Sequence, residues 1–192
     1  LEEMCTYYDL NGLELDFQRA PRFFYNHEME EGSKVMTGFV QRVREMVDRI
    51  AKERGKSIKL CVRVPETIGK CNMAGLDVVG WDELGLVDMI NMSPYYLHSL
   101  SVDIEGFKKK ITKAKLYAEL EGWSQAIFVR GAPYGDGSRF TPLDSYRATA
   151  LNFLSRGADG LAFFNYDYEP NGSPASHDKR VEAARGLKGI TD

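Results

Sequence analysis

Short apolar runs and longer helical segments alternate five times along the 192 residues, and this alternation limits the possible folds more than any other feature of the sequence. A chain that returns through a helix before each new strand builds a parallel sheet, because every strand then runs in the same direction. The runs expected to be strands are 13–17, 58–64, 87–92, 114–120 and 161–166. The sequence therefore predicts an α/β fold with about five βα units, in a single domain over residues 1–192.

Helical segments fill most of the chain between these runs. The clearest is 33–54, whose apolar residues share one stripe of a helix and which Gly55 ends. Further helices are expected at 76–84, 104–112, 141–156 and 179–186, with a loop over 122–140. Residues 1–8 have the character of a helix end, so we interpret the chain as one whose natural beginning has been removed.

Each expected strand has one apolar face and one face that becomes polar toward its C-terminal end. The polar positions are Glu14, Asp16 and Gln18 on the first strand, Cys61 and Arg63 on the second, Asn91 and Ser93 on the third, Tyr117 and Glu119 on the fourth, and Asn165 and Asp167 on the fifth. A parallel sheet covered by helices on both faces would be nearly all apolar. A closed barrel explains the pattern better, because its inner face opens into a site at the C-terminal rim.

The fold class predicted is therefore a (β/α)8 barrel of TIM type. Eight βα units need about 250 residues, so five units leave about three missing at the front, and the chain would be a C-terminal portion of the barrel. The alternative is an open, doubly wound sheet. That fold would favour phosphate-binding glycines at a strand-to-helix turn, and neither GxGxxG nor GxxxxGK[ST] occurs in the sequence.

Composition excludes several classes of protein and site. No apolar stretch reaches the roughly 18 residues of a membrane-spanning helix, and a net charge of −3 offers no basic footprint for nucleic acid. The 3 cysteines lack CxxC spacing, and the 3 histidines lack HxH or HExxH spacing. No serine lies in a GxSxG motif. We therefore expect no cofactor and no metal site, and we expect His27, His98 and His177 each to lie exposed in a loop.

Two carboxylates fall at inward-facing strand ends, and a buried carboxylate is costly without a purpose. Asp16 and Glu119 can serve as the acid and the nucleophile or base that flank a glycosidic bond. Glu14 lies one layer deeper, where it could hold Arg63. The alternative interpretation is that Asp16, Glu14, Arg19 and Arg63 form a buried ion network that only organises the barrel.

A sugar site also needs aromatic platforms and polar side chains, and several candidates fall on the same rim. The residues expected to position the substrate are Glu14, Arg19, Arg63, Asn91 and Asn165, and those expected to stack on sugar are Tyr95, Trp123 and Tyr166. Phe23, Phe24 and Tyr25 follow the first strand and fall on this rim as well. Trp81, on a helical segment, is expected in the core.

The run Tyr8–Arg19, read as Tyr-Asp-Leu-Asn-Gly-Leu-Glu-Leu-Asp-Phe-Gln-Arg, resembles the fourth-strand signature DG(I/L/V)xLDxxR of the glycosyl-hydrolase-like barrels. Further matches follow in order and span almost the whole chain: Arg63-Val64-Pro65-Glu66, Gly75-Leu76-Asp77-Val78 with Trp81, Gly85-Leu86-Val87-Asp88, Tyr117-Ala118-Glu119, and Arg156-Gly157-Ala158-Asp159-Gly160 leading to Phe164-Asn165-Tyr166.

This resemblance implies that the five strands are numbers four to eight of the barrel. In related retaining glycosidases a carboxylate ends strand four and another ends strand seven, which correspond here to Asp16 and Glu119. The resemblance also favours a secreted or cell-envelope protein, whereas the three unpaired cysteines favour a reducing compartment.

The function expected is hydrolysis of a glycosidic bond in a poly- or oligosaccharide. One alternative is a non-catalytic barrel that binds carbohydrate without turnover. Another is a structurally incomplete domain, because five strands leave two open sheet edges that can pair with a second copy of the chain.

Overall fold

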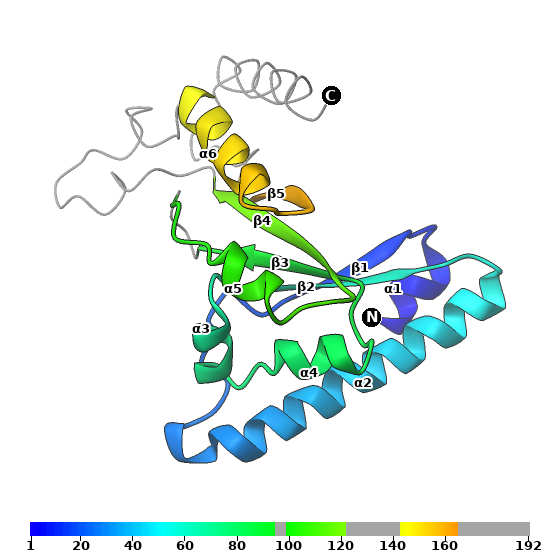
Figure 1. Ribbon diagram of the computed structural model, residues 1–192. Coiled ribbons are helices and arrows are strands. Elements are labelled where there is room, and N and C mark those ends of the chain that lie inside the picture. Colours follow the sequence, from blue (N-terminus) through cyan, green and yellow to red (C-terminus); the bar gives the residue numbers. More distant parts are fainter. Residues whose placement is uncertain (95–98, 122–142, 165–192) are drawn as a thin grey trace, which may run out of the picture.

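A computed structural model describes residues 1–94, 99–121 and 143–164, and five parallel strands organise it (Figure 1). The strands are β1 (Gly12–Asp16), β2 (Lys59–Pro65), β3 (Met89–Ser93), β4 (Lys115–Glu121) and β5 (Gly160–Phe164). They pair in chain order, β1-β2-β3-β4-β5, and every pairing is parallel. The sheet curls into a half-barrel with helices between its strands, which confirms the prediction of a partial α/β barrel.

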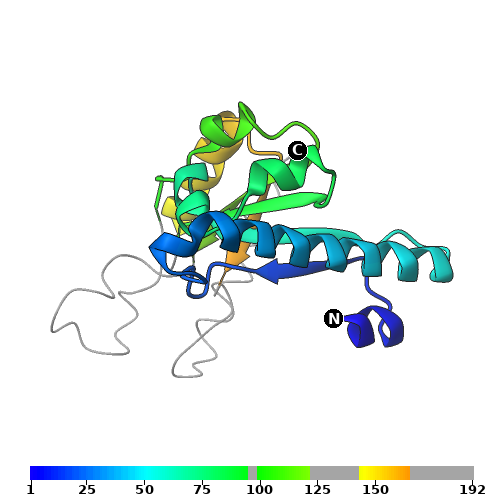
Figure 2. The same cartoon turned by 90° about the horizontal axis from the view of Figure 1, so that it is seen from below.

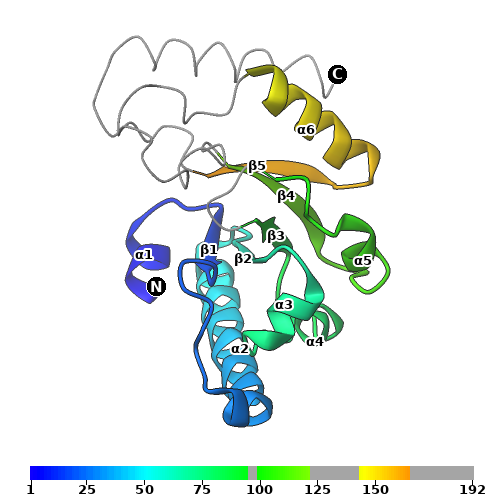
Figure 3. The ribbon, with the colours of Figure 1, turned by 90° about the vertical axis from the view of Figure 1, so that its left-hand side faces the viewer.

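Helices α2 (Met29–Arg54), α3 (Ile68–Met73), α4 (Val78–Glu83), α5 (Ile104–Lys108) and α6 (Leu143–Ser155) lie around the outer side of the curled sheet (Figure 3). Helix α1 (Glu2–Tyr7) lies beside β1 toward the open side of the curl, and a 3-10 turn, η1 (Asn26–Glu28), precedes α2. Figure 2 shows α2 running beside β1 along the length of the sheet. No helix within the described ranges is long and apolar enough to cross a membrane.

The long helix α2 begins at Met29, earlier than the expected start near Ser33. The turn η1 leads directly into it, where the Glu28 carboxylate accepts a hydrogen bond from the Tyr25 backbone N–H at 3.3 Å. The helix ends as predicted, because Gly55 adopts a left-handed conformation with φ 63°. Its buried stripe is Val40, Val43, Val47 and Ile50.

The segment between β2 and β3 forms two short helices, whereas one was expected, over 76–84. Helix α4 corresponds to the expected helix. Helix α3 was not expected, because six residues are too few to show a helical periodicity. Each helix has its own N-cap: Thr67 accepts from the Lys70 N–H, and Asp77 accepts from the Gly80 N–H. The helix expected over 104–112 is also shorter, since α5 ends at Lys108.

The core lies between the apolar face of the sheet and the helices. Leu13 and Leu15 of β1 are buried, and Glu14 between them is exposed, as the alternation predicted. Trp81 of α4 is fully buried, as expected. Its indole Nε1 donates to Thr37 Oγ1 at 3.0 Å, so the polar end of the ring is satisfied inside the core.

Aspartates fix the N-terminal ends of the strands, opposite the rim. Asp88 accepts a hydrogen bond from the Leu60 N–H, and Asp159 accepts one from the Leu116 N–H, both at 2.9 Å. Asp82 accepts from three consecutive backbone N–H groups, at residues 112–114, with nearest distances of 2.8, 3.1 and 2.7 Å. Burial alone would raise the pKa of Asp82, but these N–H groups outweigh it and lower that pKa.

We expect Asp82→Ala to lower the free energy of unfolding by about 3 kcal/mol, because it leaves several buried N–H groups without an acceptor. Asp82→Asn keeps an acceptor oxygen and should lose less. Urea unfolding at pH 7 measures both, with Glu3→Gln on the exposed face of α1 as the control. Unfolding of Asp82→Ala at the wild-type urea concentration would contradict this role.

The Asp82 carboxylate should also make the free energy of unfolding depend on pH in the acidic range. Because the pKa of Asp82 is lowered by folding, its stabilisation is complete above the unfolded pKa of about 4 and is lost as the pH falls through the lower, folded pKa. Between pH 5 and pH 2, as a rough window, wild type should therefore lose more stability than Asp82→Asn. Parallel losses in the two proteins would show that other groups carry the acid dependence.

Candidate functional site

Polar side chains on the inner face of the sheet converge on the guanidinium of Arg63. This side chain comes from β2, and the residue is 2% exposed. Its Nε and Nη2 donate to Glu119 of β4 at 2.6 and 2.8 Å. Its Nη1 donates to both carboxylate oxygens of Asp16 of β1, at 3.1 and 3.0 Å. The Arg63 guanidinium therefore joins Asp16 and Glu119, the two carboxylates expected from the sequence to act as a pair.

Strand register explains why these residues meet. Asp16 lies opposite Arg63, and Arg63 lies opposite Asn91 of β3, so the three side chains form one row on the inner face. Asn91 lies opposite Tyr117, and Glu119 is the next inward-facing residue along β4. Glu119 therefore lies one layer nearer the C-terminal rim, and the long arginine side chain spans the two layers.

The two carboxylates have different surroundings. The Glu119 side chain is 1% exposed, whereas the Asp16 side chain is 39% exposed. Besides the two bonds from Arg63, Glu119 accepts hydrogen bonds from Ser93 Oγ at 2.5 Å and from Asn91 Nδ2 at 3.3 Å. Glu119 is thus held inside the protein, and Asp16 is the member of the pair that faces solvent.

The charge of Arg63 is secured by its partners. Burial by itself would lower the pKa of this guanidinium, but the hydrogen bonds and charge of Glu119, then those of Asp16, outweigh it and raise that pKa. The guanidinium carbon also lies 3.6 Å from the ring centroid of Phe164, at the end of β5. An aromatic ring face therefore supports the cation as well.

Glu14 does not pair with Arg63, which corrects one expectation from the sequence. It lies opposite Cys61, one layer deeper than Asp16, and accepts from the Cys61 thiol at 3.1 Å and from Asn91 Nδ2 at 3.5 Å. Burial, followed by the charge of Glu14, raises the pKa of the Cys61 thiol. Cys61 is therefore a half-buried thiol donor on the inner face, where its surroundings disfavour the thiolate.

The structure brings together the expected residues Asp16, Glu119, Glu14, Arg63 and Asn91. Arg19 lies exposed in the loop after β1. Tyr95, Trp123, Asn165 and Tyr166 lie outside the described residues, so their roles stay predictions. The alternative ion network is also present in part, since Arg63 binds Asp16 but has Glu119 in place of Glu14 as its second partner.

Two further residues of the inner face were not among the expected site residues. Ser93 is fully buried and bridges Arg63 and Glu119, since its hydroxyl also accepts from Arg63 Nη2 at 2.8 Å. Glu121 continues the alternation of β4 past Glu119 and is fully buried. Ser93 lies two residues after Asn91, and Glu121 lies two residues after Glu119. This alternation along each strand was the signal in the sequence that could have identified both residues.

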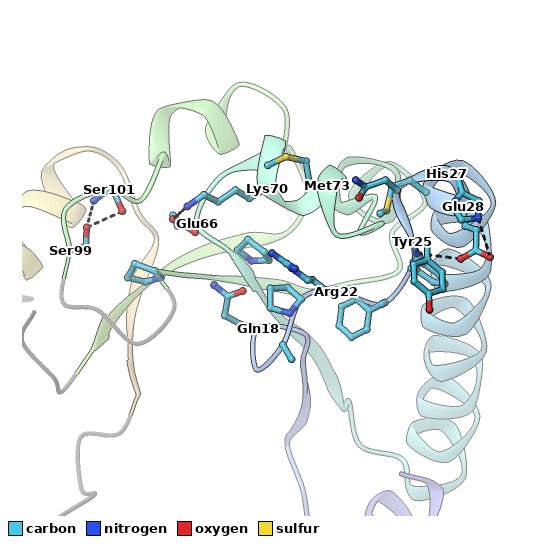
Figure 4. A pocket seen from close by; sticks show the side chains of 18 residues that line it. Gln18, Arg22, Tyr25, His27, Glu28, Glu66, Lys70, Met73, Ser99 and Ser101 are labelled. Carbon is cyan, nitrogen blue, oxygen red and sulfur yellow. Dashed lines mark hydrogen bonds and ion pairs between the residues drawn. The ribbon is translucent and has the colours of Figure 1, made fainter. Parts of the chain in front are cut away.

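A cleft of about 1470 Å³ opens at the C-terminal ends of β1 and β2 (Figure 4). It is lined by the loop from Gln18 to Met29, by the end of β2, by α3 and by Pro94, Ser99 and Ser101 between β3 and α5. Glu66 is buried in its wall and pairs with Lys70. Tyr25 stacks on His27 at its outer end, with ring centroids 5.8 Å apart. His27 is exposed, as expected, although it lies in the turn η1.

The cluster around Arg63 is not suited to a metal ion. The guanidinium occupies the position between Asp16 and Glu119 in which a cation would lie. Within residues 1–94, 99–121 and 143–164, no group of three or more His, Cys, Asp or Glu side chains is arranged to hold one. What the cluster can offer chemically is a fixed pair of carboxylates beside a cleft.

Comparison with known proteins supports the fold. No protein-family model matches the sequence, and no curated protein sequence is significantly similar. A chitinase-like agglutinin, RobpsCRA from Robinia pseudoacacia, is similar in structure, with a TM-score of 0.54 and 13% sequence identity over 90% of this chain and 67% of that chain. A protein from Toxoplasma gondii ME49 provisionally named a deoxyribose-phosphate aldolase has a TM-score of 0.46 and 17% identity, over 98% and 76% of the two chains. The agglutinin shows that the curled half-barrel is of the TIM-barrel kind.

We expect Arg63→Met to lower the free energy of unfolding by about 3–5 kcal/mol, because it leaves Glu119 buried without its counter-charge. Adding Glu119→Gln should restore part of that loss, since the neutral amide is less costly to bury. Urea unfolding of the two single variants and the double variant measures this coupling. Strictly additive losses would mean that the pair contributes nothing, and Arg42→Met, on the exposed face of α2, is the control.

Proposed function

We propose that the chain belongs to a carbohydrate-active barrel that hydrolyses a glycosidic bond, with Asp16 and Glu119 as the carboxylate pair. The observation that supports this most is the convergence of Asp16 and Glu119 on Arg63 at the inner face of the sheet. Active sites of TIM barrels lie at the C-terminal face, and the cleft that opens there is lined by Gln18, whose backbone N–H donates to Asp16. Paired carboxylates are the chemistry that glycoside hydrolysis requires.

The two members of the pair would act differently. Asp16 reaches solvent and so contacts the substrate directly, at the leaving oxygen or at the water. Glu119, held by Arg63, stabilises the positive charge that develops on the sugar ring in the transition state. Asn91 and Ser93 orient Glu119, and Arg63 holds the two carboxylates at a fixed separation.

A second candidate is carbohydrate binding without turnover. The observation that favours it is that Glu119 accepts hydrogen bonds from Arg63, Ser93 and Asn91 while its side chain is 1% exposed. A carboxylate held in this way can serve the barrel alone, and the similar structure is of a protein named an agglutinin. In this case Asp16 binds a sugar hydroxyl and nothing is cleaved.

Release of reducing sugar from a broad panel of glycans tests the proposal. Asp16→Asn and Glu119→Gln should each lower the rate by at least about 100-fold, because each removes a reacting or charge-stabilising carboxylate. Asp48→Asn and Glu83→Gln change exposed carboxylates on α2 and α4 and should leave the rate unchanged. Circular dichroism checks that every variant is folded.

Full activity in either variant of the pair would refute its assigned role. Sugar binding without release of any reducing end, with Asp16→Asn only weakening the affinity, would establish the second candidate in place of the first.

A further inference from the structure

A buried amide at the inner end of the cleft has an oxygen without a hydrogen-bond donor. Gln18 is 1% exposed, and its Nε2 donates to the Ser93 carbonyl at 2.6 Å, which fixes the orientation of the amide. The Oε1 atom makes no hydrogen bond among the described residues. Buried carbonyl oxygens are almost always paired in folded proteins. This oxygen is enclosed, so a ligand donor such as a sugar hydroxyl reaches it only as the side chains of the cleft lining adjust.

Arg22 supplies a positive charge to the same cleft. The other charged groups of the lining have partners: Lys70 pairs with Glu66, and the Glu28 carboxylate accepts from the Tyr25 N–H. The Arg22 guanidinium makes no ion pair or hydrogen bond within the described part of the chain, and the residue is exposed. Figure 4 shows its side chain in the pocket beside Gln18. Its forked N–H groups match the two oxygens of a carboxylate.

The loop that carries both residues is anchored directly after Arg22. The Phe24 ring fills the space beside two glycines: a Cβ at Gly32 would lie 2.4 Å from the ring, and one at Gly75 would lie 2.8 Å from it. Phe23 contacts Phe17 edge to face, with centroids 6.0 Å apart. The backbone that presents Gln18 and Arg22 is thus held before any ligand binds, which lowers the entropy cost of binding.

We propose that this cleft is a subsite for an acidic sugar, a uronic acid residue, of the oligosaccharide. A ring hydroxyl donates to Gln18 Oε1 and the sugar carboxylate accepts from Arg22, while the exposed Tyr25 ring at the outer end of the cleft offers a face for the next sugar of the chain. The subsite adjoins the carboxylate pair directly, because the Gln18 backbone N–H donates to Asp16 Oδ1 at 2.8 Å. This inference rests on the proposed function for its carbohydrate ligand and adds that the carbohydrate is anionic.

Calorimetric titration of the 192-residue chain tests the subsite. The probes are trisaccharides of galacturonate, glucuronate and mannuronate, each beside its carboxyl methyl ester at the same ionic strength. We expect at least one acid to bind about tenfold or more tightly than its ester, because the ester cannot form the charged fork with Arg22.

Two variants separate the two contacts. Arg22→Met should abolish the preference for the acid and leave binding of the ester unchanged, whereas Arg42→Met, an exposed arginine on α2, should change neither. Gln18→Met should weaken acid and ester by the same factor, because both present the hydroxyl. Arg22 is exposed, so its variant keeps the test valid even where the buried Gln18 variant fails to fold.

The outcomes distinguish this inference from the proposed function. Equal binding of every acid and its ester, absence of binding by all three acids, or a preference that survives Arg22→Met would overturn the acidic subsite, even where the chain cleaves a neutral glycan. A preference that Arg22→Met abolishes, in a chain that cleaves no glycan, would establish the subsite and refute hydrolysis.

Discussion

The charge of one buried arginine determines how the inner face of this sheet is built. Arg63 holds Asp16 and Glu119 from two strands that are not neighbours, and without it Glu119 would be an uncompensated buried anion. Ser93 and Asn91 add hydrogen bonds to the same carboxylate, and Phe164 covers the guanidinium. The positions of the carboxylates are therefore set by the cation, and any chemistry at the rim depends on a group that does not itself need to react.

The alternation of polar and apolar residues predicted much of this arrangement. Side chains in a strand change face at every residue, so Asp16, Arg63, Asn91 and Glu119 could be assigned to one face from the sequence alone. The partners could not be assigned, because they depend on register: Glu14 lies opposite Cys61, and Arg63 therefore finds Glu119. The same limit applies to Gln18, since the pairing of its amide with the Ser93 carbonyl depends on how far β3 extends past β1.

The helices show where local signals are strong and where they are weak. Gly55 fixed the end of α2 because a left-handed residue interrupts the helix whatever lies around it. The start of α2 and the existence of α3 depended instead on packing of the preceding loop, in which Phe24 lies against Gly32 and Gly75. Six residues capped by Thr67 make a helix only because β2 and α4 place them there.

The aspartates at the N-terminal ends of the strands give the framework its own attachment points, remote from the rim. Asp88 and Asp159 bind backbone N–H groups of neighbouring strands, and Asp82 binds the turn that leads into β4. None of these contacts involves the loop from Gln18 to Met29 or the cleft it lines. The rim loops can therefore be exchanged between related chains, or redesigned for a different ligand, as replaceable parts on an unchanged frame.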